Sequence, residues 1–219
     1  MSVEQAVPVQ VTRYSFTVAE YERMGEVGIF SEDDRVELVC GEVIKMSPIG
    51  NRHAACVDVL DELLRERLGR SVQVRVQNPI RLDEYSEPQP DITVLKRRDD
   101  FYRHAHPGPG DVLLVIEVSD TTLDYDRRVK VPLYARSGIP EVWVVNLSDG
   151  RIEAHAAPAG GVYQTAGTYA RGDELRSHAL PALRLPVAEV LGYNSQPPRT
   201  RLTPGGARGV GFAVAAGGG

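Results

Sequence analysis

Two apolar runs decide the fold of this chain: Pro90-Asp91-Ile92-Thr93-Val94-Leu95 and Val112-Leu113-Leu114-Val115-Ile116-Glu117-Val118-Ser119. Each run is typical of a buried strand, and each carries one carboxylate near an end. A bare carboxylate in such a run is costly unless a positive charge lies against it. Asp91 and Glu117 therefore require a shared cation, either a metal ion or a lysine, and Lys130 follows a short way downstream.

The two acids are candidates for a metal site. If their strands are neighbours joined by the loop at 97–110, both carboxylates reach one edge of the sheet. Two oxygen ligands with open positions suit Mg²⁺ or Mn²⁺, which keep waters and take further ligands from a substrate phosphate. The alternative is structural: Asp91 caps a turn after Pro90, and Glu117 pairs with an arginine.

Lys130 is the candidate partner of these acids. A lysine beside a metal-bound phosphate stabilises developing negative charge, and two nearby carboxylates would hold it protonated. The alternative is an ordinary surface lysine, because Asp126 precedes it by four residues, the favourable order for a helical ion pair.

Three further residues are candidates for accessory roles. Glu37 lies in an alternating strand where its face is ambiguous, so it is either a third acid at the site or a solvated edge residue. His53 lies in a first helical turn, where a phosphate contact and a surface position are both compatible with the sequence. Asp126 is interpreted as the orienting partner of the lysine that follows it. Ser119 and Thr122 are expected to cap the next helix rather than to bond a carboxylate.

Hydrophobic periodicity and turn residues predict the remaining elements. They are, in order, a helix from Thr17 to about Gly28, a hairpin over 36–46, a helix from an N-cap at Asn51 to Gly69, a strand at 72–76 extended beyond a break by 78–82, strands at 91–95 and 112–118, a mostly helical segment over 123–137, strands at 141–147 and 151–154, a loop and a strand near 162–165, and a short helix over 187–191. Pro132 must kink its helix or sit in its first turn. This order indicates one mixed α/β domain with a central sheet, not a barrel or a bundle.

Composition sets the broad class. The 219 residues, 42% of them apolar, suffice for one well-filled core, and the net charge of −5 gives no global basic field. Cys40 and Cys56 match no metal spacing, so reduced thiols in a cytoplasmic protein are expected. No apolar signal core or run of 18 apolar residues is seen, which predicts no membrane association. The pairs Gly160-Gly161 and Gly205-Gly206 lack the Lys-Ser/Thr of a phosphate loop, and no organic cofactor is expected. We expect an N-terminal arm over 1–13, a domain over 14–193 and a disordered Gly/Pro-rich tail over 194–219.

The motifs together resemble the Uma2 family, whose members are described as endonucleases of the PD-(D/E)XK superfamily. The matching pieces are Val36-Glu37-Leu38, Gly41-Glu42-Val43, His53, Pro90-Asp91, Glu117-Val118-Ser119, Thr122, Asp126, Lys130, Tyr134-Ala135 and Gly138-Ile139-Pro140-Glu141-Val142-Trp143-Val144-Val145.

This resemblance implies a restriction endonuclease-like core, a central mixed β-sheet flanked by helices. It also implies that Asp91, Glu117 and the carbonyl of Val118 bind Mg²⁺ or Mn²⁺, that Lys130 is the active-site lysine, and that the protein cleaves DNA as a homodimer. The common superfamily pattern places the lysine where this chain has Ser119, and Lys130 fits a lysine supplied from the following helix. Five arginines are candidates for DNA backbone contacts: Arg97, Arg98, Arg103, Arg127 and Arg128. The alternative function is a catalytically inactive module that binds DNA or a protein partner.

Overall fold

The computed structural model describes residues 12–31 and 33–192. The expected tail, and all of the expected arm except residues 12 and 13, lie outside these ranges. In chain order, the elements are α1 (Val18–Glu26), β1 (Val36–Val39), β2 (Glu42–Lys45), α2 (Asn51–Leu68), the 3₁₀ turn η1 (Gly69–Ser71), β3 (Val72–Val76), β4 (Ile92–Lys96), the 3₁₀ turn η2 (Pro109–Asp111), β5 (Val112–Ser119), α3 (Leu123–Tyr125), the π-helical segment η3 (Asp126–Lys130), α4 (Val131–Arg136), β6 (Glu141–Asn146), β7 (Arg151–Ala159), β8 (Val162–Ala170), β9 (Glu174–Arg176), β10 (Arg184–Pro186) and α5 (Val187–Val190). None of the helices in these ranges is long and apolar enough to cross a bilayer.

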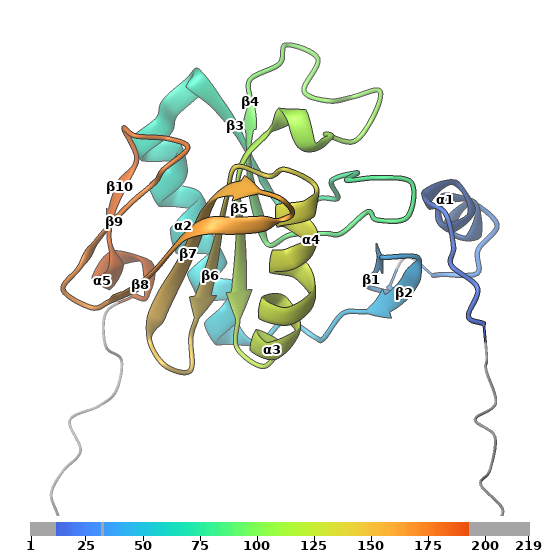
Figure 1. Ribbon diagram of the computed structural model, residues 1–219, viewed down its shortest axis with the longest axis horizontal. Coiled ribbons are helices and arrows are strands. Elements are labelled where there is room, and N and C mark those ends of the chain that lie inside the picture. Colours follow the sequence, from blue (N-terminus) through green and yellow to red (C-terminus); the bar gives the residue numbers. More distant parts are fainter. Residues whose placement is uncertain (1–11, 32, 193–219) are drawn as a thin grey trace, which may run out of the picture.

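The centre of the molecule is a mixed sheet of six strands in the order β3-β4-β5-β6-β7-β8. Neighbouring strands are antiparallel except β5 and β6, which are parallel and are joined by the helical crossover α3–η3–α4. The condition set for the two acids, that their strands are neighbours, is met, because β4 pairs with β5 from Ile92 opposite Ile116. Figure 1 shows α2 on one side of this sheet and α4 on the other.

Alternation along β5 divides the core between the two faces of the sheet. Leu114, Ile116 and Val118 pack with α2, whereas Val115 packs with α4. Successive side chains of a strand point to opposite faces. Glu117, which lies between two residues of the α2 face, therefore points toward α4. This register places the second acid on the side of the sheet from which the crossover helix supplies Lys130.

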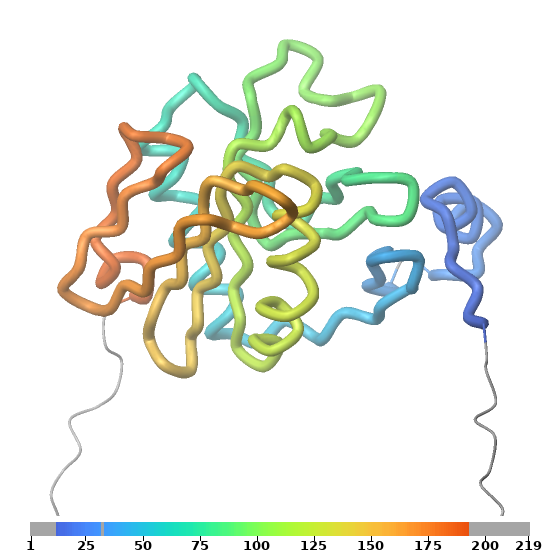
Figure 2. Tube along the Cα trace, in the orientation of Figure 1, coloured from blue at the N-terminus to red at the C-terminus, as the bar shows by residue number. Residues whose placement is uncertain are grey.

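The hairpin β1–β2 is a separate two-stranded sheet. The predicted capping box is present, since Thr17 accepts from the backbone N–H of Glu20 and Glu20 accepts from that of Thr17, and α1 follows it directly. Figure 1 shows the hairpin between α4 and α1, apart from the central sheet. In Figure 2 the first and last described residues lie at opposite ends of the molecule.

Several element predictions are corrected by the structure. Segment 78–82 is not a strand but one arm of a loop, in which the N–H of Ile80 donates to Pro88 and that of Leu82 to Ser86. Its apolar alternation has a different cause, because Ile80 and Leu82 bury their side chains from the loop. The N-cap of α2 is Gly50 rather than Asn51. Beyond residue 154 the expected loop is instead the continuation of β7, which runs to Ala159 and pairs with a β8 that reaches Ala170.

The helical crossover contains an irregularity that the sequence only partly predicts. Pro132 lies in the first turn of α4, one of the two placements expected for it. The preceding segment is π-helical, and the N–H of Val131 donates to the carbonyl of Asp126. Proline supplies no N–H and its ring collides with the carbonyl four residues earlier, so a widened turn here accommodates it. Lys130 and Asp126 are the two ends of this π-helical segment.

Candidate active site

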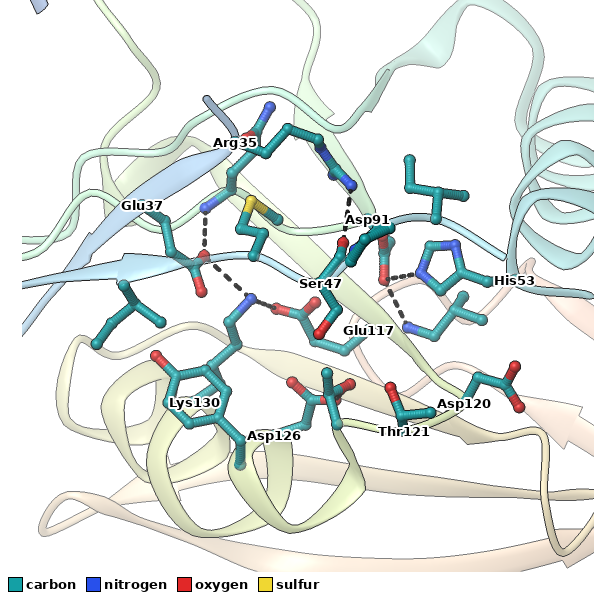
Figure 3. A pocket seen from close by; sticks show the side chains of 18 of the residues that line it. Arg35, Glu37, Ser47, His53, Asp91, Glu117, Asp120, Thr121, Asp126 and Lys130 are labelled. Atoms are coloured by element: carbon teal, nitrogen blue, oxygen red, sulfur yellow. Dashed lines mark hydrogen bonds and ion pairs between the residues drawn. The ribbon is translucent and has the colours of Figure 1, made fainter. Parts of the chain in front are cut away.

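The sequence-predicted residues converge on one pocket of about 440 Å³. Its walls come from the hairpin β1–β2 and the segment that follows it, the first turn of α2, the end of β5 and the start of the crossover helix. The site residues that line it are Glu37, His53, Asp91, Glu117, Val118, Asp126 and Lys130. Figure 3 shows Lys130 reaching from its helix toward Glu37 and Glu117, with His53 beside Asp91.

Asp91 immediately precedes β4 and is held by three donors. Its Oδ2 accepts from the backbone N–H of Val118 at 2.9 Å and lies 3.0 Å from Nε2 of His53, while Oδ1 accepts from Nε2 of Gln77 at 3.3 Å. Burial acts to raise the pKa of this carboxyl, but the hydrogen bonds from His53 and Val118 outweigh burial and lower it. The same hydrogen bond to Asp91 raises the pKa of His53. Asp91 is therefore ionised and fixed in orientation.

Glu117 is the most strongly perturbed acid of the pocket. Only 3% of its surface is exposed, and its Oε1 accepts a 2.6 Å hydrogen bond from the Tyr134 hydroxyl. Burial raises the pKa of Glu117 to about 8; Lys130 opposes this rise, and the neighbouring carboxylates of Asp126 and Asp91 add to it. The Glu117 carboxyl therefore holds its proton near neutral pH unless further positive charge lies beside it.

Lys130 is buried between two carboxylates. Its Nζ lies 3.1 Å from Oε2 of Glu37 and 3.3 Å from Oε1 of Glu117, and only 4% of the residue is exposed. Burial acts to lower the pKa of Lys130, but the charges of Glu117 and Glu37 outweigh burial and raise it, so the ammonium stays protonated. The alternative of an ordinary surface lysine paired with Asp126 is wrong.

Asp126 has other partners than the one expected. Its Oδ2 accepts hydrogen bonds from the hydroxyls of Ser119 and Thr122, both at 2.7 Å. The preference for Ser119 and Thr122 as helix caps is therefore wrong, and Thr122 makes no side-chain cap although it occupies the N-cap position of α3. Asp126 acts on Lys130 through its charge, since no ion pair between these two side chains occurs among the described residues.

Glu37 and His53, whose positions were open in the sequence, both face the pocket. Glu37 is buried and accepts from the backbone N–H of Gln89 at 3.0 Å as well as from Lys130. His53 comes from the first turn of α2, and its Nδ1 is buried with no hydrogen-bond partner in the structure. Both belong to the network around the two acids.

The donor set is compatible with a hard divalent cation. An ionised carboxylate offers about four lone-pair positions. Donors from the described residues occupy three of these positions on Asp91 and two on Glu117. The Oε2 atom of Glu117 has no donor from the described part of the chain. No cluster of three or more His, Cys, Asp or Glu side chains that could hold a metal occurs in the described ranges. Mg²⁺ commonly takes only one or two carboxylates and completes its shell with waters and a phosphate, so two acids suffice.

Two residues that hold the acids of the pocket, Gln77 and Tyr134, were missed in the sequence. Gln77 directly follows β3, and the β3–β4 register places its backbone N–H on the carbonyl of Asp91. The pairing of β3 with β4 was therefore the signal that could have identified Gln77 as a neighbour of Asp91. Tyr134, whose ring belongs to the core on the α4 side of the sheet, also bonds Glu117 through its hydroxyl. Arg35 and Lys45 are the basic residues of the lining other than Lys130.

The five arginines proposed for DNA contacts do not line this pocket. Arg97 and Arg98 stack on Phe101 and Tyr102, and Arg127 pairs with Glu153. The loop that carries the first two joins the end of β4 to the start of β5, whereas the acids lie at the opposite ends of these strands. Three of the five thus make contacts within the protein, and DNA contacts by these arginines stay a prediction.

Comparison with known proteins identifies the fold and the family model that the chain matches. Residues 18–188 match the Uma2 model, described as "Putative restriction endonuclease". A solved structure, that of "a putative nuclease belonging to DUF820 from Anabaena variabilis ATCC 29413", is similar with a TM-score of 0.61 and 12% sequence identity, over 80% of this chain and 97% of that one. At that identity the likeness shows a shared fold, a central mixed sheet flanked by helices. No curated protein matches the chain.

Proposed function

Because the chain belongs to the Uma2 family of restriction endonuclease-like proteins, we propose that it is a metal-dependent endonuclease that hydrolyses DNA phosphodiester bonds. The observation that carries this proposal is the position of the Lys130 ammonium, 3.3 Å from Glu117 although the two residues come from a helix and a strand. A lysine that has moved from the strand to the next helix thus remains beside the second acid.

In this proposal Asp91, Glu117 and the main-chain carbonyl of Val118 hold Mg²⁺ or Mn²⁺. A divalent ion supplies Lewis-acid stabilisation of charge on the phosphate and lowers the pKa of water. His53 and Gln77 orient Asp91, and the Tyr134 hydroxyl orients Glu117. These contacts fix both carboxylates before substrate arrives, which reduces the reorganisation needed in the transition state.

Lys130 stabilises the charge that develops on the phosphate. An ammonium has three N–H donors, and the described ion pairs with Glu37 and Glu117 engage two of them. The third is available to a phosphate oxygen that enters the pocket. Glu37 anchors the ammonium from the hairpin β1–β2, which makes it a positioning residue.

The test is cleavage of supercoiled plasmid and of circular single-stranded DNA with Mg²⁺ or Mn²⁺. We expect cleavage by the wild type that requires metal and falls at least ~100-fold in Glu117→Gln and Lys130→Ala, as for loss of an electrostatic catalytic group. Glu62→Gln, on the exposed side of α2, is the matched control and should cleave normally. Circular dichroism checks that each variant folds. A folded wild type that cuts neither DNA above Glu117→Gln would overturn the proposal and favour the inactive binding module.

The homodimer and the cytoplasmic location expected from the sequence stay predictions. Sedimentation of the full chain measures the first.

A further inference from the structure

The acids of the site are recessed. The side chains of Asp91, Glu117 and Lys130 are 11%, 4% and 5% exposed. A phosphate that reacts at them has to enter the pocket rather than rest across its mouth. The shape of the pocket therefore limits which nucleic acids can react.

The pocket is of a size for a small part of a nucleic acid. Its volume of about 440 Å³ falls within the range of sites that enclose small ligands. One wall is the end of β2 and segment 46–50, and the other is segment 120–126 at the start of the crossover helix. A segment of base-paired duplex, whose major groove alone is about 12 Å wide, is too large to be enclosed in such a volume. A single unpaired nucleotide is not.

The wall formed by the end of β2 and the following segment carries four apolar residues beside Lys45 and Ser47. Ile44, Met46, Pro48 and Ile49 line it, and Ile49 remains 42% exposed although it is a large hydrophobic residue. Enzymes that take a nucleotide out of the stack hold its base between aromatic or apolar side chains. The apolar wall and the recessed acids border the same cavity, so one nucleotide can contact both.

The charge around the pocket argues in the same direction. Its lining contains three Lys or Arg residues, namely Arg35, Lys45 and Lys130, against five Asp or Glu residues, and the whole chain carries −5. Tight binding to a duplex depends on many phosphate contacts by basic residues. Binding of single strands draws a larger share of its energy from contacts with base faces. The lining, with few basic residues, therefore suits a single strand better than a duplex.

We propose that the substrate of this site is single-stranded DNA, or an unpaired stretch within a duplex, which enters with one unstacked nucleotide whose base lies against Ile44, Met46, Pro48 and Ile49. Arg35 and Lys45 contact the neighbouring backbone phosphates. This inference rests on the proposed endonuclease function and names the form of its substrate.

The experiment compares one labelled DNA strand in three forms: alone, fully paired, and paired except for a short internal gap. With Mg²⁺ or Mn²⁺, wild-type protein should cut the free strand and the gap at least about tenfold faster than the paired DNA, a ratio equal to the loss of one base contact. Cleavage of the full duplex as fast as the free strand would overturn the inference while leaving the endonuclease proposal intact. An RNA strand cut in preference to the DNA strand would keep the single-strand form and overturn the assignment to DNA.

A matched pair of variants tests the apolar wall. Ile49→Ser should raise KM for the single strand by about tenfold with a smaller change in kcat. Ile29→Ser is the control, because Ile29 is 64% exposed and does not line the pocket. Equal KM values for the two variants would contradict the proposed base contact.

Binding separates this inference from the proposed function. Fluorescence anisotropy with Ca²⁺ in place of Mg²⁺ measures affinity for the free strand and for the duplex. A single strand bound at least about tenfold more tightly supports the inference even if no DNA is cut, in which case only the endonuclease proposal fails. Equal affinity, or no binding to either form, overturns the inference.

Discussion

The buried charges of the pocket are each compensated in a different way. Asp91 accepts N–H donors, Asp126 accepts two hydroxyls, and Glu37 and Glu117 share the single ammonium of Lys130. Buried ions are tolerated only when hydrogen bonds and opposite charges replace lost hydration. Lys130 pairs with only two of these four carboxylates, and a divalent cation bound at Asp91 and Glu117 would supply further positive charge.

At the scale of the residue, the hydroxyl of Tyr134 is expected to stabilise the fold as well as the site. Tyr134→Phe removes the 2.6 Å hydrogen bond to Glu117 and leaves the ring in place. We expect the free energy of unfolding to fall by about 1–3 kcal/mol, as when a buried acceptor loses its hydrogen-bond donor. Urea denaturation measures it. Tyr163→Phe, which loses a bond to the backbone oxygen of Ile139, should cost less; an equal or larger cost would contradict the special role of the Glu117 contact.

A second residue, Glu87, is not a proposed metal ligand, and its titration makes the stability of the fold depend on pH. It is 4% exposed, its Oε2 has no hydrogen-bond partner, and burial, with the charge of Glu22, raises its pKa to about 7 from a usual 4.5. As pH rises from about 4.5 to about 7, the unfolded chain releases this proton before the folded chain does, so the folded state loses stability.

Glu87→Gln removes that penalty because glutamine does not ionise. The stability of the variant relative to wild type should grow with pH across this window and reach about 2–3 kcal/mol above it. Urea denaturation in chelator at about pH 5 and about pH 8 measures the change. Glu62→Gln provides the exposed control. A difference that stays constant between the two pH values would show that Glu87 does not titrate as stated.

At the scale of the element, the hairpin β1–β2 and the π-helical segment each present a charged residue to the sheet. Glu37 lies on β1, which makes a backbone bridge from Leu38 to Glu87 and belongs to a sheet separate from the central one. Lys130 ends the π-helical segment. Their ion pair joins the hairpin to the crossover helix. The geometry of the site therefore depends on how these two small elements are held.

The hairpin turn gives a prediction at this scale. Gly41 has φ of +79°, and a Cβ there would lie 2.6 Å from Cβ of Ser15. Gly41→Ala should therefore lower the free energy of unfolding by about 1–3 kcal/mol and reduce DNA cleavage, because Glu37 lies in the same hairpin. Thermal denaturation and the plasmid assay measure the two effects.

Gly25→Ala is the matched control. Gly25 lies in α1 with no atom within 4 Å of the added Cβ and without a positive φ. Alanine there should raise stability by up to about 1 kcal/mol, since alanine favours a helix more than glycine does. If Gly41→Ala proved as stable as Gly25→Ala, the close approach of Ser15 at the hairpin turn would not limit the stability of the fold.

At the scale of the whole molecule, hydrophobic cores cover both faces of the sheet, and the two acids lie together at one end of its central strands. The core against α2 and the core against α4 meet through β5, whose alternate residues belong to each. Asp91 lies where β4 begins and Glu117 where β5 ends, so a cation bound to both would link these two central strands. Asp91 also bonds His53 of α2, and Glu117 pairs with Lys130 of the crossover, so the same cation would tie in both helical elements.

Divalent metal is therefore expected to stabilise the folded protein. At a hundredfold excess over its Kd, Mg²⁺ or Mn²⁺ should add about 2.7 kcal/mol, seen as a higher Tm that chelator reverses. Glu117→Gln should abolish most of the shift. Monovalent salt at matched ionic strength is the control. A Tm that rises equally in wild type and Glu117→Gln would exclude Glu117 as a ligand.

The sequence by itself determined the two acidic strands and the helix that is α2. It also singled out Asp91, Glu117 and Lys130 as candidate residues of the active site. These inferences rest on local facts: the periodicity of apolar residues and the cost of a carboxylate within an apolar run. The fold class followed from the order of the elements, and its likeness to a solved structure confirms it.

Tertiary structure alone decided the partners. Lys130 faces Glu37 rather than Asp126 because packing of α4 on the sheet turns its side chain inward, toward a hairpin far away in the chain. The loop at 78–82 resembles a strand because burial of Ile80 and Leu82 gives the same alternation as pairing would. A local pattern records that a side chain is buried, whereas the group it meets depends on contacts between segments distant in sequence.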